Sequence, residues 1–486
     1  MEFSIQDSQL LATKGLINGQ WVDADDNSTV PVVNPATGEQ LTDVANMGAA
    51  ETRRAIEAAS DALPGWSDLS AQKRSTLLEA WYDLVMENQD ELAAILTAEQ
   101  GKPLFEAKGE VAYGASYIKW FAEEARRVYG DIIPAAQPGR RNLVVKQPVG
   151  VVAAITPWNF PSAMLARKIA PALAAGCTIV CKPATETPLS ALALVALAQK
   201  AGVPDGVINL VVGSRSADIG GEMTSNPIVR KLTFTGSTPV GKLLMKQCAD
   251  TVKRTSMELG GNAPIIIFDD ADLDQAIDGA LVSKFRNSGQ TCICSNRLLV
   301  QAGIYDRFIE RLAEKVGQFR VGNGLEESTT HGPLVSEKAV TGVKALVDSA
   351  VADGARVVIG GDSGEQGSCF FQPTILADAT PAMGVFKEEI FGPVAPVFRF
   401  ESDDEAIALA NDTEFGLAAY LYTNNLKRIW KVSEALEYGM VGVNETAISS
   451  EVIPFGGVKE SGQGREGSKY GLDDYLETKL ICLGGL

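Results

Sequence analysis

The segment Asn287-Ser288-Gly289-Gln290-Thr291-Cys292-Ile293-Cys294 places two cysteines one residue apart beside a glycine-containing turn. A cysteine on a tight turn can expose its sulfur as a nucleophile, while backbone N–H groups of the turn stabilise an oxyanion. Histidine is the usual activator of such a thiol, but the chain has a single histidine, His331, directly before the turn pair Gly332-Pro333. The reaction therefore needs another base, and the best candidate upstream is Glu258 in Met257-Glu258-Leu259-Gly260-Gly261-Asn262.

Both segments are similar to signature motifs of one enzyme superfamily. Gly289-Gln290-Thr291-Cys292 resembles the nucleophile motif of the aldehyde dehydrogenases, and Glu258-Leu259-Gly260-Gly261-Asn262 resembles their glutamate motif. A lone cysteine is more often a packing residue, but the two motifs in this order favour catalysis. The resemblance implies that Cys292 attacks the aldehyde carbon and that Glu258 activates the water that hydrolyses the resulting thioester.

The resemblance covers essentially the whole chain and assigns roles to residues at strand ends. Thr156-Pro157-Trp158-Asn159-Phe160-Pro161 follows an expected strand, and the resemblance implies that Asn159 donates a hydrogen bond to the oxyanion. Asparagine at such a turn is also a common helix cap. The resemblance further implies a set of cofactor contacts: Thr156, Pro157, Trp158, Lys182, Thr185, Gly213, Gly236, Ser237, Leu259, Glu389 and Phe391.

The choice of cofactor depends on two short segments. The dinucleotide fingerprint Gly-x-Gly-x-x-Gly is absent after the first strand of the α/β pattern, and in its place Gly236-Ser237 opens a helix whose N–H groups can hold a phosphate. NAD-restricted members of the superfamily have a glutamate at position 185 that repels a 2′-phosphate, whereas this chain has threonine. A hydroxyl beside Lys182 predicts NADP as cofactor, with NAD as the alternative, and no metal takes part.

Within the superfamily the chain is most similar to the succinate-semialdehyde dehydrogenase subgroup. Lys284-Phe285-Arg286-Asn287 and two glycine-rich segments, 455–462 and 464–471, carry this resemblance. A substrate with an aldehyde at one end and a carboxylate at the other needs fixed cations, and arginine binds a carboxylate through two hydrogen bonds. The implied carboxylate-binding residues are Arg167, Arg286 and Ser449. The expected reaction oxidises succinate semialdehyde to succinate and reduces NAD(P)+, through a thiohemiacetal and a thioester on the cysteine.

Several alternatives remain. Glutarate semialdehyde is one methylene longer and would use the same arginines, a difference worth roughly 1–3 kcal/mol of discrimination. A CoA-acylating relative would transfer the acyl group to a thiol, but such relatives generally lack the glutamate at Glu258. A non-catalytic descendant of the fold would be expected to lose Cys292 or Glu258. Some members of the subgroup use the cysteine that matches Cys294 as a redox switch, and the alternative role for Cys294 is packing.

Composition and charge narrow the class of protein. The chain has 486 residues, 45% hydrophobic and 21% charged, as in a soluble globular protein with room for two domains. A net charge of −18 gives no field for attracting nucleic acid. Seven cysteines without paired Cys-x-x-Cys blocks argue against disulfides or structural zinc, and no apolar run of about 18 residues predicts a membrane span. Because residues 1–7 also lack a leader pattern, we expect a cytoplasmic enzyme.

Short β-branched runs alternate with helical segments between residues 149 and 268. This alternation predicts a parallel sheet with helices on both faces and ligands at the C-terminal strand ends. Residues 48–128 are mostly helical, and residues 16–33 resemble a hairpin around Asn18-Gly19. The expected strands are 149–156, 178–182, 207–212, 231–235 and 264–268, and the expected helices lie near 163–175, 188–201, 216–225 and 238–249.

A second α/β pattern starts at residue 270. Its expected strands are 298–301, 356–359, 394–400, 418–423 and 440–444, with helices near 304–318, 337–353 and 403–411. The fold class is α/β. The resemblance implies an aldehyde dehydrogenase-like fold with a Rossmann-type dinucleotide-binding domain (1–128 and 149–260), an α/β catalytic domain (261–446) and a β arm (129–148 and 472–486) that forms a homotetramer or homodimer. Because the domains join near Glu258, their cleft should bring Glu258 and Cys292 together.

Overall fold

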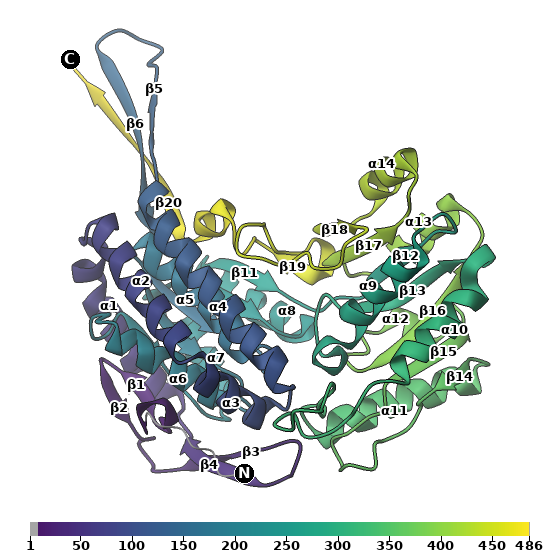
Figure 1. Cartoon of the computed structure of the whole chain (residues 1–486). Coiled ribbons are helices and arrows are strands. Elements are labelled where there is room, and N and C mark those ends of the chain that lie inside the picture. The colour runs from purple at the N-terminus through teal and green to yellow at the C-terminus, as the bar shows by residue number, and fades with distance from the viewer. Residues whose placement is uncertain (1–7, 486) are drawn as a thin grey trace.

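An eight-stranded sheet forms the core of the first part of the molecule, in a computed structural model that describes residues 8–485 (Figure 1). Its five central strands, from β11 to β9, run parallel, so their C-terminal ends meet along one edge. The strands lie in the order β19 (Gly462–Gln463), β11 (Arg254–Glu258), β10 (Val229–Thr235), β7 (Val151–Ile155), β8 (Thr178–Lys182), β9 (Ile208–Leu210), β1 (Gly15–Ile17) and β2 (Gln20–Val22). Three sequence predictions concern residues that lie outside the described range. They are the lack of a leader pattern in residues 1–7, the domain start at residue 1 and the arm end at residue 486.

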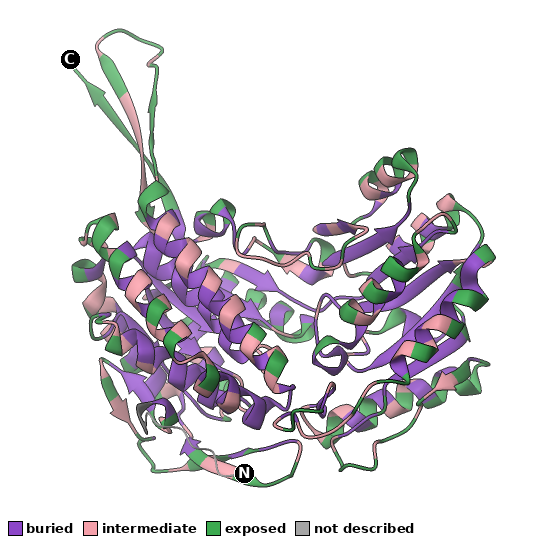
Figure 2. Ribbon diagram, viewed as in Figure 1, coloured by how far each residue is buried: buried purple, intermediate pink, exposed green. Residues whose placement is uncertain are grey.

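Helices cover both faces of this sheet, as the alternating pattern predicts. On one face, α5 (Pro161–Ala175) and α6 (Pro188–Lys200) lie beneath α2 (Ala71–Glu87), α3 (Gln89–Gln100) and α4 (Leu104–Glu124). On the other face are α1 (Ala49–Ser67), α7 (Ser216–Ser225) and α8 (Thr238–Ala249). Every residue of α5 is buried, because this helix lies between the sheet and α4 (Figure 2).

All nine strands and helices expected between residues 149 and 268 are confirmed, with ends shifted by at most two residues. One expectation was only partly right: the hairpin around Asn18-Gly19 ends at β2, and β3 (Thr29–Val33) pairs with β4 (Gln40–Ala45) instead. Strand β11 was not expected, because the run from Arg254 to Glu258 is mostly polar. It forms nevertheless, since β10 and β19 supply hydrogen-bonding partners on both of its edges.

A seven-stranded sheet forms the core of the second part. Along β12, Ile265 and Ile267 pack into one hydrophobic core while Ile266 packs into the other, so both faces of this sheet are buried. The strands lie in the order β14 (Arg356–Ile359), β15 (Thr374–Ala379), β16 (Val394–Phe400), β13 (Ser295–Gln301), β12 (Ala263–Ile267), β17 (Ala418–Tyr422) and β18 (Met440–Val443). The helices are α9 (Leu273–Phe285), α10 (Tyr305–Val316), α11 (Glu337–Ala352), α12 (Gly384–Lys387), α13 (Asp403–Asn411) and α14 (Leu426–Ala435). Of these elements, β15, α9, α12 and α14 were not expected.

A three-stranded sheet projects from the body of the molecule (Figure 1). Its strands are β20 (Leu476–Gly484), β6 (Arg140–Pro148) and β5 (Asp131–Ile133), with β6 in the middle and antiparallel to both neighbours. These strands coincide with the predicted arm, and most of their residues are exposed or half-buried (Figure 2). No helix among residues 8–485 has the length and apolar character needed to cross a membrane.

Candidate active site

The link between the two large sheets is the glutamate motif itself. β11 ends at Glu258 and β12 begins at Ala263, so the four residues between them carry the chain from one sheet to the other. A Cβ atom at Gly261 would lie 2.2 Å from the carbonyl oxygen of Cys292. Only glycine permits this close approach, which brings the motif against the nucleophile segment as the sequence predicts.

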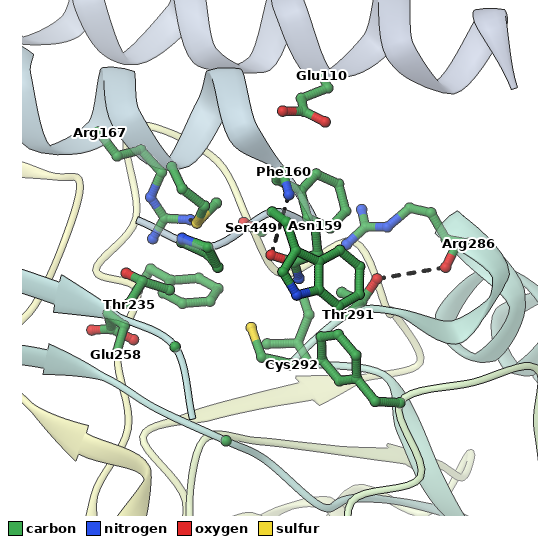
Figure 3. Close-up of a pocket in the computed structure, with 18 of the residues that line it drawn as sticks. Glu110, Asn159, Phe160, Arg167, Thr235, Glu258, Arg286, Thr291, Cys292 and Ser449 are labelled. Carbon is green, nitrogen blue, oxygen red and sulfur yellow. Dashed lines mark hydrogen bonds between the residues drawn. The ribbon is translucent and has the colours of Figure 1, made fainter. Parts of the chain in front are cut away.

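A cavity of about 520 Å³ opens at this junction. Cys292 lies in it with Glu258 and Arg167 on one side and Arg286 on the other (Figure 3). Asn159 and Ser449 also line the cavity. The structure thus brings the predicted catalytic residues and the predicted carboxylate-binding residues into one space.

The turn before Cys292 has an unusual backbone. Asn287, Ser288 and Gly289 have φ angles of 51°, 53° and 76°, so three successive residues adopt the left-handed region. This conformation costs a non-glycine residue about 1–2 kcal/mol, and it persists only where neighbouring groups fix it. At Gly289 a Cβ atom would lie 2.2 Å from the carbonyl oxygen of Gly392, which explains the glycine of the motif.

Gln290 provides much of this fixation. Its Nε2 donates to the carbonyl of Asn287 (3.1 Å), and its Oε1 accepts from the backbone N–H of Val335 (2.9 Å). Its own carbonyl accepts from Nδ2 of Asn159 (3.0 Å). The hydroxyl of Ser288 donates to the carbonyl of Gly332 (2.8 Å). The glutamine of the nucleophile motif therefore has a structural role, which is to fix this turn, and its position in the sequence does not reveal that role.

The side chain of Asn159 is held beside the nucleophile turn. It follows β7, and its Oδ1 accepts from the N–H of Phe160 (3.2 Å) while Nδ2 donates to Gln290. Its backbone carbonyl accepts from the buried ammonium of Lys102 (2.7 Å) and from Nδ2 of Asn287 (2.9 Å). An amide nitrogen has two hydrogens, so one remains for a ligand in the cavity.

The electrostatics of Cys292 favour a protonated sulfur. Burial, followed by the nearby carboxyls of Glu389 and Glu258, raises the pKa of Cys292 to about 12, and Arg167 and Arg286 oppose this only in part. At neutral pH the side chain is therefore a thiol, which must lose its proton as it reacts.

Glu258 is a buried carboxyl group whose pKa is shifted by its surroundings. Burial and the neighbouring Glu466 raise the pKa of Glu258 well above its usual range, while Arg167, Lys168 and Arg465 oppose the shift. Within residues 8–485 its Oε2 has no hydrogen-bond partner. A carboxyl group with a raised pKa and one oxygen free of hydrogen bonds is suited to accepting a proton and releasing it again.

The three predicted carboxylate-binding residues differ in their electrostatic state. Arg167 is 1% exposed, its Nη2 lies 2.8 Å from Oε2 of Glu466, and its guanidinium packs on the ring of Phe455. Its Nη1 donates to the hydroxyl of Tyr113 (3.2 Å), which contacts the hydroxyl of Ser449.

Arg286 is exposed, lies 5.4 Å from the ring centroid of Phe160, and has no ion-pair partner among the described residues. Unlike Arg167, it has no direct carboxylate partner among the described residues, so its guanidinium is available to a ligand in the cavity.

Cys294 lies beneath the turn rather than in the cavity. Its sulfur is buried and donates to the carbonyl of Lys284 at the end of α9 (3.2 Å). Burial raises the pKa of Cys294, and the Lys284 ammonium opposes this. The redox switch between Cys292 and Cys294 stays a prediction.

The predicted cofactor residues lie along the C-terminal edge of the first sheet and across the junction. Seven of them line the cavity: Pro157, Trp158, Gly236, Ser237, Leu259, Glu389 and Phe391. The rings of Trp158 and Phe391 meet edge to face at 5.5 Å. Oε1 of Glu389 accepts from the N–H of Gly261 (3.0 Å); burial raises the pKa of Glu389 to about 7.

The remaining cofactor residues lie at the ends of β7, β8 and β9. The ammonium of Lys182 donates to the carbonyl of Pro183 (3.2 Å), and the hydroxyl of Thr185 donates to the carbonyl of Gly213 (3.2 Å). The hydroxyl oxygens of Thr156 and Thr235 are buried without a hydrogen-bond partner in the described part of the chain. Unpaired polar groups along the strand ends fit a polar ligand such as a dinucleotide.

Two buried glutamates occupy helix N-termini, and so they limit where such a ligand could place its phosphates. Oε1 of Glu110 accepts from the N–H groups of Ser162 and Ala163 at the start of α5. At the start of α6, the carboxylate of Glu99 accepts from the first N–H groups in the same way. Helix α8 begins at Thr238, and the side chain of its N-cap residue, Ser237, makes no capping hydrogen bond. The N-terminal N–H groups of α5 and α6 are therefore already bonded to glutamate side chains, whereas α8 can hold an anion.

Sequence reasoning missed the polar network that supports the junction. The ammonium of Lys284 donates to Oδ1 of Asn296 (3.2 Å), and Nδ2 of Asn296 donates to Oδ1 of Asn262 (3.1 Å). Nδ2 of Asn262 then donates to the carbonyl of Phe386, just before Glu389. Asn262 belongs to the quoted glutamate motif and could have been suspected, but Asn296 carries no local signal.

Sequence reasoning also did not reveal the structural role of the C-terminal glycine-rich segments. β19 pairs with β11, so that Glu258 lies opposite Gly462, and a Cβ atom at Gly462 would lie 1.9 Å from the carbonyl of Met257. The hydroxyl of Ser461 donates to the carbonyl of Gly260 (2.7 Å). These segments resemble the subgroup motif, and the structure gives them a physical role, because they hold the glutamate motif in place.

Taken together, two α/β sheets with a thiol and a buried carboxyl at their junction define an aldehyde dehydrogenase fold, and comparison with known proteins agrees. Residues 21–481 match the aldehyde dehydrogenase family, and the chain belongs to this family. It is 59% identical over 482 residues to the glutarate-semialdehyde dehydrogenase of Pseudomonas aeruginosa, covering 99% of this chain and 100% of that protein. It is also 59% identical over 480 residues to the succinate-semialdehyde dehydrogenase (NADP+) of Escherichia coli, covering 99% of both. The crystal structure of succinate-semialdehyde dehydrogenase from Burkholderia pseudomallei has a TM-score of 0.98 at 57% identity, covering 99% of this chain and 100% of that one.

Proposed function

We propose that this enzyme oxidises succinate semialdehyde to succinate and reduces NADP+, with NAD+ as a second acceptor. One observation carries the proposal: the cavity that holds Cys292 and Glu258 also holds Arg286, an exposed arginine without an ion-pair partner among the described residues. A small aldehyde with a carboxylate at its far end satisfies both the thiol and the cation. The names of the relatives described above support the same substrate class.

In the proposed mechanism, the chain supplies the nucleophile, the oxyanion donor and the base. The sulfur of Cys292 attacks the aldehyde carbon and loses its proton to a base, a role that we assign to the carboxylate form of Glu258. The free hydrogen of the Asn159 amide, with the backbone N–H of Cys292, stabilises the oxyanion of the thiohemiacetal. After oxidation to the thioester, Glu258 passes the thiol proton to solvent and, as a carboxylate again, takes a proton from water as the water oxygen attacks the acyl carbon. The C–S bond then breaks, Cys292 leaves as a thiolate that regains a proton, and the carboxylate product is released.

We assign the dinucleotide site to the C-terminal edge of the first sheet. Ser237 at the start of α8 would hold the pyrophosphate, Lys182 and Thr185 the adenosine ribose, and Glu389 and Phe391 the nicotinamide ribose and ring. When bound, the cofactor accepts the hydride that leaves the thiohemiacetal. The missing glutamate at position 185 and the buried ammonium of Lys182 support acceptance of a 2′-phosphate.

Comparative kinetics tests this assignment. We expect kcat/KM for succinate semialdehyde to exceed that for butanal, which has the same carbon number and no carboxylate, by about 10- to 100-fold, because one charge-assisted contact is worth roughly 1.5–3 kcal/mol. Glutarate semialdehyde in the same assay separates the alternative, since a relative with that name is equally similar. A larger kcat/KM for the five-carbon substrate would replace succinate semialdehyde as the assigned substrate.

Alanine variants of the two arginines locate the carboxylate. Arg286→Ala should raise KM for succinate semialdehyde about tenfold or more and leave KM for butanal nearly unchanged. Arg167→Ala should impair both substrates, because it removes one of the two cations paired with the buried Glu466, beside Glu258, and leaves only Lys168. Equal losses on both aldehydes for Arg286→Ala would remove it from the carboxylate site.

We further propose three structural units, a homodimer or homotetramer, and a cytoplasmic location. The two large sheets mark the dinucleotide-binding and catalytic domains, and the projecting sheet marks an oligomerisation arm. All seven cysteines are free, which suits a reducing compartment.

A further inference from the structure

The left-handed turn at residues 287–289 separates Arg286 from Cys292, so its shape sets the position of both. Asn287 and Ser288 hold positive φ angles although neither is glycine. The hydrogen bonds described above fix the end of this turn through Gln290 and its middle through Ser288. The start of the turn is fixed by a different group.

That group is a carboxylate from a distant helix. Oε2 of Glu106, in the first turn of α4, accepts from the backbone N–H of Asn287 (2.9 Å). Glu106 lines the same cavity as Arg286. Burial raises the pKa of Glu106, while Lys102, the N–H of Asn287 and Arg286 oppose this shift. The contact is a hydrogen bond in a largely buried place, where loss of the acceptor would leave the Asn287 N–H unpaired.

We infer that Glu106 is a positioning residue, whose carboxylate holds the left-handed turn so that Cys292 and Arg286 face the same substrate. This inference rests on the proposed function for its substrate effect, but its structural part stands on the contact itself. When the acceptor is lost, the N–H of Asn287 is left unpaired and the turn can relax towards an ordinary backbone conformation. A shift of the turn moves the nucleophile and the carboxylate anchor together.

Two variants of Glu106 separate the hydrogen bond from the charge. Glu106→Ala removes the acceptor, while Glu106→Gln keeps an oxygen acceptor and removes the charge. Glu123→Ala is the matched control, because it removes a carboxylate from the same helix that makes only a surface ion pair. Should Glu106→Ala fail to fold, Glu106→Asp withdraws the acceptor by one carbon and keeps the charge, with the same expectation.

The first measurement is hydrogen–deuterium exchange of residues 286–292 in enzyme without substrate or cofactor. We expect exchange in Glu106→Ala to be about tenfold faster than in wild type, and exchange in Glu106→Gln and Glu123→Ala to match wild type. The second is steady-state kinetics, in which Glu106→Ala should lose about tenfold in kcat for both aldehydes and gain in KM for the semialdehyde only. Glu106→Gln should recover most of both losses.

Unchanged exchange in Glu106→Ala would overturn the inference, and so would a Glu106→Gln enzyme as impaired as Glu106→Ala, since charge rather than the hydrogen bond would then matter. These outcomes are distinct from a failure of the proposed function. A wild-type enzyme that does not oxidise the semialdehyde, combined with faster exchange in Glu106→Ala, would reject the substrate and keep the positioning role.

Discussion

At the scale of single residues, the site contains a thiol and a carboxyl group that both have raised pKa values. Burial raises the pKa of Cys292 to about 12 and holds the pKa of Glu258 well above its ordinary range, with Glu466 adding to the second effect. Both shifts oppose the charged forms, so the thiolate and the carboxylate are each disfavoured in this buried site. The same arrangement keeps the thiol from ionising and oxidising while no substrate is bound.

Replacing the base should separate the two halves of the reaction. In Glu258→Gln the negative charge that helps raise the pKa of Cys292 is gone, so thiol ionisation is favoured, but no carboxylate remains to activate water. We expect one burst of reduced cofactor per subunit and then a fall of about 10²-fold or more in steady turnover. Rapid-mixing spectroscopy of the reduced cofactor measures both phases. Cys292→Ala is the control and should give no burst, and steady turnover near wild type in Glu258→Gln would exclude the assigned role.

A single substitution should change the preference between the two dinucleotides. In Thr185→Glu a carboxylate replaces the hydroxyl that contacts the Gly213 carbonyl, and it would repel a 2′-phosphate. The ratio of kcat/KM for NADP+ to that for NAD+ should fall by about tenfold or more. Thr185→Gln has a similar size without charge and should keep the wild-type ratio. If both variants behave alike, size rather than charge at position 185 controls the preference.

At the scale of elements, carboxylates on neighbouring helices decide which helix ends remain open. Glu99 on α3 and Glu110 on α4 cap α6 and α5, and burial raises the pKa of Glu99 to about 8. Such caps act between segments that are distant in sequence, so no local pattern reveals them. They give a physical reason why the dinucleotide fingerprint is absent after β7: the helix that would use it is already capped.

The loop that supports the nucleophile turn should make stability depend on pH. His331 is buried, its ring lies 4.0 Å from that of Phe319, and burial lowers the pKa of His331 to about 4 from an ordinary 6.5. Between these values the unfolded chain binds a proton that the folded chain does not, so this contribution is present above pH 6.5 and is lost as pH falls towards 4.

We expect His331→Phe, which stays aromatic and cannot be protonated, to lose about 2–3 kcal/mol less of its free energy of unfolding than wild type between pH 7 and pH 4. Denaturant unfolding at a series of pH values measures the difference, and other groups cancel because they titrate in both proteins. Parallel curves for the two proteins would show that the ring is not the titrating group.

Sequence patterns predicted some parts of this molecule and could not predict others. The runs at 178–182 and 216–225 coincide with β8 and α7, because β-branched and helical periodicities are local signals. The polar strand β11 was missed, since its stability comes from β10 and β19. Among the candidate site residues, motif resemblance identified Cys292 and Glu258, which share the cavity. It could not show that Arg167 is balanced by Glu466, because that contact joins distant segments.

At the scale of the whole molecule, the arm presents a surface that a single subunit leaves uncovered. Ile132, Leu143 and Ile481 are register partners across its three strands, so they lie on one face, and Ile132 is 77% exposed. An apolar row beside two open strand edges favours association with further copies of the chain.

The proposed association can be tested by placing a charge in this row. Ile481→Asp should shift the enzyme from a tetramer or dimer towards smaller species, because burying a carboxylate in an apolar interface costs several kcal/mol. Light scattering coupled to size-exclusion chromatography measures the mass. Thr478→Asp places the same charge on the opposite face of β20 and serves as the control. A wild-type monomer at micromolar concentration would contradict the proposed oligomer.

The pairing of β11 with β19 also has a consequence for how the protein is made. A ribosome completes the strand that ends at Glu258 on the order of 10–40 s before it completes β19. During this interval one edge of β11 has no partner, and such an edge is a site for mispairing with other nascent chains. Strand β11 consists mostly of polar and charged residues: arginine, threonine, serine and glutamate. These residues make the unpaired edge a poor template for aggregation, and they also make the strand hard to predict from sequence patterns. The strand that ends at Glu258 is therefore paired on both edges only late in synthesis, when β19 has been made.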